Sequence, residues 1–118
     1  MVELEASIDA ALTAGVAREA IAIDPGFGFA KRTEHSVATL RALGRFCALG
    51  FPIAVGVSRK RFLGELSRVD AAAARVAGSV AANVVALLGG ARIFRVHDVA
   101  ATRQALDVAW SLRVATAD

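Results

Sequence analysis

The chain has 118 residues and a formal net charge of +3, which is enough for one domain spanning residues 1–118 and leaves little room for a second. Although 56% of the residues are hydrophobic, no run of about 18 uncharged apolar residues occurs, so we expect no membrane span. The positive charge is dispersed and shows no recognition-helix pattern or metal-finger spacing, which argues against a nucleic-acid partner. The single cysteine, Cys47, excludes an internal disulfide and, with an acidic first segment unlike a secretory signal, favours a cytoplasmic location.

Helices and strands are predicted to alternate along the chain. In order, we expect a helix at 2–14, a strand within 20–29, a helix at 33–49, a strand within 52–60, a helix at 71–88, a strand within 91–99 and a helix at 102–114. The helices follow from apolar residues spaced by three and four, with Gly15 as a stop for the first and Thr102 as a cap for the last. The strand cores IAI, IAV and IFRV are almost unbroken apolar runs, which indicates an α/β protein with parallel strands covered on both faces.

Polar residues follow each predicted strand, in the stretches 24–29, 58–61 and 95–98. Because ligands bind at the carboxyl ends of parallel strands, we expect the three stretches to meet at one site. The sequence has no HxxxH, CxxC or dense carboxylate pattern, so we expect no metal ion held by protein ligands. No serine–histidine–acid arrangement stands out either, which leaves ligand binding by a basic, partly aromatic pocket.

The stretch DPGFGF begins with Asp24, whose carboxylate can accept two hydrogen bonds from a planar donor pair such as an aminopyrimidine-type ring. Gly26 and Gly28 permit positive φ angles, so the loop can bend and bring Phe27 and Phe29 near a ligand. The alternative is a strand-ending turn in which Asp24 serves as a cap. A dinucleotide site is not expected, because GFGFAK has lysine where the GxGxxG fingerprint has glycine.

The other two stretches, SRKR and RVHD, are basic. Residues 58–61 lie where a strand turns into a helix, and amide groups there favour an anion, although a solvated basic face is the alternative. Arg95 and His97 share a face of the last strand and suit a phosphate group, although a structural histidine is the alternative. We expect Asp98, on the other face, to hold the turn or to make a capping bond.

Taken together, IDPGFGFAK, VGVSRKRFLG and RVHDV, in this order and at these separations, resemble the dihydropteroate synthases of bacterial folate synthesis, over about residues 3–112. The resemblance implies a (β/α)8 TIM barrel, of which this chain would hold the last three strands in the order α-β-α-β-α-β-α. It also implies a transferase that condenses 6-hydroxymethyl-7,8-dihydropterin diphosphate with para-aminobenzoate to 7,8-dihydropteroate and diphosphate. A pterin-binding methyltransferase relative is disfavoured, because SRK is the synthase signature.

The resemblance also implies roles for individual residues. Asp24 would pair with the ring N–H and amino group of the pterin, and Lys60 would bond the pterin beside the para-aminobenzoate pocket, so these two are the expected catalytic residues. Arg95 would lie over the pterin face and, with His97, would bind the diphosphate. Positive charge at that place suits a leaving diphosphate.

The para-aminobenzoate site would comprise four residues, which are Gly28, Phe29, Lys60 and Arg61. Many family members have a serine where this chain has Arg61, and that serine contacts the carboxylate of the substrate. Here a backbone amide could serve instead, or the Arg61 guanidinium could pair with the carboxylate directly.

Parts of the family pattern are missing from this chain. Nothing resembles the first strand, whose asparagine helps to hold Mg²⁺ and the diphosphate, so the family's magnesium would lack its protein ligand here. We therefore expect the chain alone to be inactive or nearly so, and the alternative is a non-catalytic partial barrel that binds a pterin or an anion. Exposed strand edges favour association with another chain. The family dimerises through its last helices, so we expect this chain to form a homodimer or another self-associated state, with the apolar helix at 71–88 in the contact.

Overall fold

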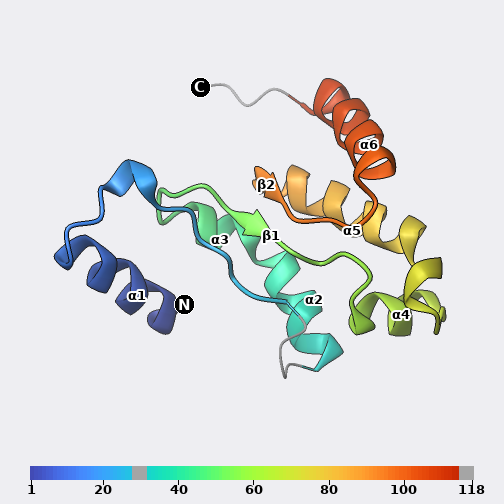
Figure 1. The fold of residues 1–118 in the computed structure, drawn as a ribbon, viewed down its shortest axis with the longest axis horizontal. Coiled ribbons are helices and arrows are strands. Elements are labelled where there is room, and N and C mark those ends of the chain that lie inside the picture. The colour runs from blue at the N-terminus through green and yellow to red at the C-terminus, as the bar shows by residue number, and fades with distance from the viewer. Residues whose placement is uncertain (28–31, 115–118) are drawn as a thin grey trace.

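The computed structural model describes residues 1–27 and 32–114 (Figure 1). In chain order its elements are α1 (Val2–Thr13), the 3₁₀ turn η1 (Arg18–Ala20), α2 (Thr33–Arg41), α3 (Leu43–Cys47), β1 (Ala54–Val55), α4 (Arg61–Ser67), the 3₁₀ turn η2 (Ala72–Ala74), α5 (Val76–Leu88), β2 (Ile93–Phe94) and α6 (Val99–Leu112). Figure 1 shows α1 at one end of the molecule and α5 and α6 toward the other, with the two strands between them.

The sheet is small and parallel. Its pairs are Ala54 opposite Ile93, Val55 opposite Phe94 and, on the other side of β1, the single bridge of Ile23 with Ile53. The prediction of an α/β protein with parallel strands is confirmed. Of the strand predicted within 20–29, the described residues 20–27 form only the one bridge at Ile23. The sequence explains this reduction, because Pro25 comes two residues after Ile23 and has no N–H to donate to a ladder.

Apolar side chains of the strand segments and the surrounding helices form the core. Its larger, deeply buried members are Ile23, Phe27, Leu43, Ile53, Val55, Val57 and Phe62. The Phe27 and Phe62 rings stack with their centroids 6.5 Å apart, which fastens the loop after Ile23 to α4. The prediction that Phe27 lies near a ligand is therefore wrong, because its ring is fully buried and packs against Phe62.

Several helix boundaries differ from the prediction. The helix predicted at 33–49 is broken at Ala42, whose φ of −94° and ψ of 12° leave the helical range, and Leu43 beyond it is buried. Helix α4 is an additional element, so that α5 begins only at Val76. Thr102 is not a cap, because α6 begins three residues earlier and the Thr102 N–H bonds to the Asp98 carbonyl within the helix.

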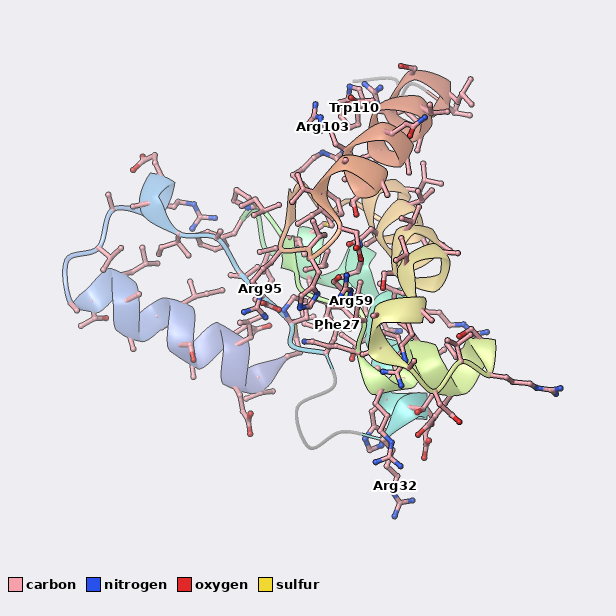
Figure 2. All side chains as sticks on the ribbon, turned by 45° about the vertical axis from the view of Figure 1, so that its right-hand side comes forward. Phe27, Arg32, Arg59, Arg95, Arg103 and Trp110 are labelled. Atoms are coloured by element: carbon pink, nitrogen blue, oxygen red, sulfur yellow. The ribbon has the colours of Figure 1, made fainter. Side chains whose placement is uncertain are left out.

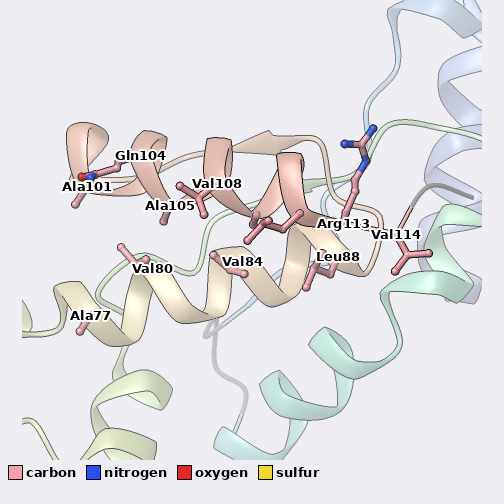
Figure 3. A pocket seen from close by; sticks show the side chains of 12 residues that line it. Ala77, Val80, Val84, Leu88, Ala101, Gln104, Ala105, Val108, Arg113 and Val114 are labelled. Carbon is pink, nitrogen blue, oxygen red and sulfur yellow. The ribbon is translucent and has the colours of Figure 1, made fainter.

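Helices α5 and α6 pack along each other and leave an apolar groove of about 850 Å³ between them (Figure 3). Val80 and Val84 of α5 and Ala105 and Val108 of α6 are among its lining side chains. The opposite face of α5 is buried, and its buried residues are Ser79, Ala82, Asn83, Ala86 and Leu87. Within the described residues, no helix has the length and apolarity needed to cross a membrane.

Candidate functional site

A polar pocket of about 400 Å³ lies at the carboxyl ends of β1 and β2. Its lining residues are Gly56, Ser58, Lys60, Arg95, Val96 and His97. The polar stretches after the second and third predicted strands therefore meet at one place, as parallel strand ends should. Figure 2 shows Arg59, Arg95 and Phe27 gathered in this region, whereas Arg103 and Trp110 lie on α6.

Lys60 connects this pocket with the loop that follows Ile23. Its Nζ donates to the Phe27 carbonyl over 2.5 Å, so the ammonium lies over the end of the first extended segment. Burial lowers the pKa of Lys60 below its usual value, and the nearby positive charge of Arg95 lowers it further, whereas the Asp24 carboxylate acts in the opposite direction. Arg95 and Asp24 thus both lie within electrostatic reach of Lys60, although the three residues come from different strand ends.

Arg95 extends along the backbone of β1. A Cβ atom built on Gly56 would lie 2.9 Å from Arg95 Nη2, which is closer than real side chains approach. Gly56 is buried, so a glycine at this position is what allows the planar guanidinium to lie against the strand end. The arrangement presents a flat cation at the pocket, which suits a ring or an anion.

Asp24 forms the strand-ending turn that was the alternative to ligand binding. Its Oδ1 accepts a hydrogen bond from the Gly26 N–H over 2.8 Å, and Gly26 has a φ of 79°. The carboxylate nevertheless remains exposed, and a carboxylate can accept several further hydrogen bonds. The turn and a ligand contact are therefore compatible, and the pterin role of Asp24 stays a prediction.

His97 is held by Ser58. The Ser58 Oγ accepts from the His97 backbone N–H over 3.1 Å and lies 2.9 Å from the ring Nδ1. Because the hydroxyl oxygen already accepts the backbone N–H, its own proton can be donated to Nδ1 of a neutral ring. The neutral imidazole then carries its proton on Nε2, where it can donate to an anion.

Arg59 and Asp98 differ from what the sequence predicts. Arg59 donates from Nε and Nη2 to the two Asp98 carboxylate oxygens over 3.1 and 2.8 Å, and this contact lowers the pKa of the Asp98 carboxyl below its usual range. Of the two roles expected for Asp98, the capping bond is wrong, because Asp98 precedes α6 without a side-chain capping bond. Its contact with Arg59, in the turn after β1, agrees with the other role, which was to hold the turn. The Arg59 guanidinium is likewise engaged with a carboxylate in the structure, and α4 has only seven residues, so its amino end is a weak anion site.

Of the remaining predicted residues, the structure describes only Arg61, which does not line the pocket. The Arg61 side chain is exposed and pairs with Glu65 over 3.2 Å, one helical turn further on. Gly28 and Phe29 lie outside the described residues. Among residues 1–27 and 32–114, the structure contains no group of three or more histidine, cysteine or acidic residues that could hold a metal ion. The described residues therefore do not fit a magnesium site built from protein ligands.

Comparison with known proteins agrees with these motifs. Residues 1–97 match the family described as Pterin binding enzyme. The chain is 46% identical over 108 residues to a dihydropteroate synthase of Neisseria meningitidis serogroup C, which covers 91% of this chain and 38% of the relative. It is 40% identical over 111 residues to an inactive dihydropteroate synthase 2 of Mycobacterium bovis, which covers 94% of this chain and 35% of that protein.

The solved structure of the Xanthomonas albilineans dihydropteroate synthase in complex with 7,8-dihydropteroate superposes with a TM-score of 0.92 at 47% identity, over 96% of this chain and 43% of that one. The chain thus spans less than half the length of the relatives it matches. The family predicted from the three motifs is confirmed: this chain belongs to the pterin binding enzymes and is a partial homologue of the dihydropteroate synthases.

Proposed function

We propose that this chain provides the part of a dihydropteroate synthase site that binds the dihydropterin diphosphate. The observation that carries the proposal is the convergence of Lys60, Arg95 and His97 on one pocket, with the Asp24 charge acting on Lys60. Three basic groups of different geometry around 400 Å³ suit a planar ring that carries a diphosphate.

Each group has a chemical task in this proposal. The Asp24 carboxylate accepts hydrogen bonds from the ring N–H and the amino group of the pterin, and the Lys60 ammonium donates one to an acceptor atom of the ring. Arg95 lies over the ring face and, with the Nε2–H of His97, binds the diphosphate. As the bond from the exocyclic carbon to the diphosphate oxygen breaks, the carbon becomes cationic and the oxygens gain charge, which the Arg95 guanidinium offsets. The nitrogen lone pair of para-aminobenzoate then forms the new bond to this carbon, and the amine loses a proton.

The para-aminobenzoate side is the less complete half of the proposal. We assign it to Lys60 and Arg61, with Gly28 and Phe29 of the loop outside the described residues. Arg61 would have to exchange its exposed contact with Glu65 for the substrate carboxylate. An exposed ion pair is weak, so this exchange costs little.

A second function is favoured by a specific observation. One relative, 40% identical over 94% of this chain, is named as an inactive dihydropteroate synthase 2. Since this chain spans less than half of its relatives, we propose that the chain alone binds a pterin diphosphate, or a simpler anion, with little or no turnover. The family's Mg²⁺ would then accompany the diphosphate as its counterion.

We also propose self-association through the groove between α5 and α6. The groove is long, apolar and continuous with exposed Leu88, Val108 and Leu112, and such a surface is stabilised by burial against a second copy. A homodimer would cover this face and leave the polar pocket accessible, because the two are lined by different residues.

Calorimetric titration of the chain with the dihydropterin diphosphate and Mg²⁺, followed by para-aminobenzoate and a diphosphate-release assay, tests the proposal. We expect binding that Asp24→Ala and Lys60→Ala weaken strongly and that Arg103→Ala on α6 does not change. We expect no diphosphate release to follow. Turnover by the chain would contradict its proposed inactivity, and a folded chain that binds neither the pterin nor inorganic diphosphate would overturn the proposed function.

A further inference from the structure

The pairing of β1 with β2 continues beyond the two strands through side chains. Ala54 pairs with Ile93 and Val55 with Phe94 in the sheet. The same spacing of 39 residues joins Ser58 to His97 and Arg59 to Asp98. Two consecutive residues of one loop thus bind two consecutive residues of the other, in the register set by the strands.

The reason for this change from backbone to side-chain bonds lies at Val57. The Arg95 N–H bonds to the Val55 carbonyl, and in a regular parallel ladder the next N–H, from His97, would bond to the Val57 carbonyl. That carbonyl instead accepts from the Lys60 N–H over 3.2 Å, which closes the turn into α4. The Ser58 hydroxyl takes over the His97 N–H, so the two strand ends stay joined while the chain turns.

Arg59 stands in this turn with a φ of 57°, a left-handed conformation that a non-glycine residue rarely adopts. Its backbone is held from both sides. The Arg59 N–H donates to Ser79 Oγ over 2.8 Å, and Arg75 Nη1 donates to the Arg59 carbonyl over 2.9 Å. The guanidinium of Arg59 is fixed by the two oxygens of Asp98.

Arg75 reaches Arg59 only because residue 64 is a glycine. A Cβ atom on Gly64 would lie 2.5 Å from Arg75 Nε, and Gly64 is buried. Arg75 is fixed in turn by the Val69 and Asp70 carbonyls, which accept from its Nε and Nη2. The left-handed turn thus rests on α4, α5 and the start of α6 together.

Lys60 follows Arg59 directly, so the direction of its side chain depends on this turn. We propose that Arg59, Asp98, Ser79, Arg75 and Gly64 form a positioning frame that aims the Lys60 ammonium at the Phe27 carbonyl and the polar pocket. In the proposed function, the frame contacts neither substrate. Its importance for ligand binding rests on that proposed function. Its effect on the place of Lys60 is independent of any ligand.

The first test compares Asp98→Asn with the native chain by NMR, through the pKa of Lys60 and the Arg59 Nε–H signal. Asp98→Asn removes a negative charge, which by electrostatics alone lowers the pKa of Lys60 further. If the frame fails and Lys60 leaves its partly buried place beside Arg95, the pKa of Lys60 rises toward the usual lysine value. Lys60 would also lose the Asp24 charge, which acts in the opposite direction, but burial is the largest of the three effects. We expect the rise, with partial return to the native value in Asp98→Glu.

Asp107→Asn is the matched control, because Asp107 forms an ion pair with Arg103 at 2.8 Å on the exposed surface of α6. It should leave both signals unchanged.

A second pair of variants tests the turn itself. Arg59→Gly and Arg59→Ala both remove the guanidinium, but glycine adopts a φ of 57° without strain. The pKa of Lys60 should therefore stay closer to native in Arg59→Gly than in Arg59→Ala, and this comparison decides the proposal if Asp98→Asn does not fold.

Affinity for the dihydropterin diphosphate, measured on the same variants, separates this proposal from the proposed function. We expect Asp98→Asn to bind about tenfold more weakly, because a displaced ammonium loses one directed contact. If the native chain does not bind the pterin, the proposed function fails while the Lys60 signals still decide the frame. If Asp98→Asn folds, does not raise the pKa of Lys60 and leaves the affinity unchanged, the frame is overturned. It is also overturned if glycine and alanine at 59 behave alike.

Discussion

The polar pocket at the strand ends and the apolar groove on α5 and α6 differ in size and in chemistry. The groove is the larger, at about 850 Å³ against 400 Å³, and it is lined almost entirely by aliphatic side chains. The pocket holds three basic groups: Lys60 donates to the Phe27 carbonyl, Arg95 lies against Gly56, and His97 is held by Ser58. The polar groups of the pocket, and not its size, therefore make it the candidate site for a charged planar substrate. The larger groove is suited to contact with another apolar surface.

The Lys60→Ala substitution should show the difference between the polar pocket and the groove in ligand binding most clearly. Lys60→Ala takes one charged donor from the pocket, so affinity for the dihydropterin diphosphate should fall by about 10–100-fold, as expected for a hydrogen bond to a charged group. Val84→Ala, at the groove, should leave this affinity unchanged. Calorimetry on both variants makes the comparison, and equal losses would mean that the regions are not independent.

A methyl group at Gly56 should have the next largest effect. Gly56→Ala places a Cβ at 2.9 Å from the Arg95 guanidinium, which must move away from the strand end. We expect about tenfold weaker binding of inorganic diphosphate, with the fold retained. Gly44→Ala is a matched control, since a Cβ there meets nothing within 4 Å. Unchanged diphosphate binding in Gly56→Ala would remove Arg95 from the proposed anion site.

A charge in the groove should weaken self-association and leave ligand binding at the polar pocket unchanged. Val80→Asp places a carboxylate among aliphatic side chains of α5 and α6, and a carboxylate is costly to bury. Sedimentation velocity should show weaker self-association, by about tenfold or more, with pterin affinity unchanged. A native chain that stays monomeric at high concentration would contradict the proposed use of the groove.

The smallest effect concerns stability at acid pH. The pKa of Asp98 is lower in the folded chain than in the unfolded one, so its pair with Arg59 stabilises the fold above the usual aspartate pKa. This contribution is lost as the pH falls through the folded-state value. The difference in denaturation midpoint between the native chain and Asp98→Asn should therefore narrow on acidification below about pH 4. A gap that is constant with pH would show that the pair does not contribute in this way.

The sequence predicted the alternation of helices with parallel strands because apolar runs and helical periodicity are local signals. It also predicted that the stretches around Lys60 and Arg95 would meet, because parallel strands share one end. It failed at Phe27, since a glycine-rich loop says nothing about which aromatic turns inward to meet Phe62.

The roles of Arg59 and Asp98 could not be recognised from either motif alone. Their pairing depends on the register of β1 with β2, which only the folded sheet defines. One signal was present, because SR and HD lie at the same spacing as the two predicted strands, but a register must be known before that spacing has meaning. The left-handed φ of Arg59 has no local signature, since the residue is not a glycine.

The most direct test of the central claim is an NMR titration of the chain, labelled on lysine, arginine, histidine and methyl groups, with the dihydropterin diphosphate and Mg²⁺. The account predicts that the Lys60, Arg95 and His97 side-chain signals shift together with one dissociation constant, while the Val84 and Leu88 methyl signals of the groove do not. Shifts confined to the groove, or separate dissociation constants for Lys60 and Arg95, would contradict a single pterin site at the strand ends.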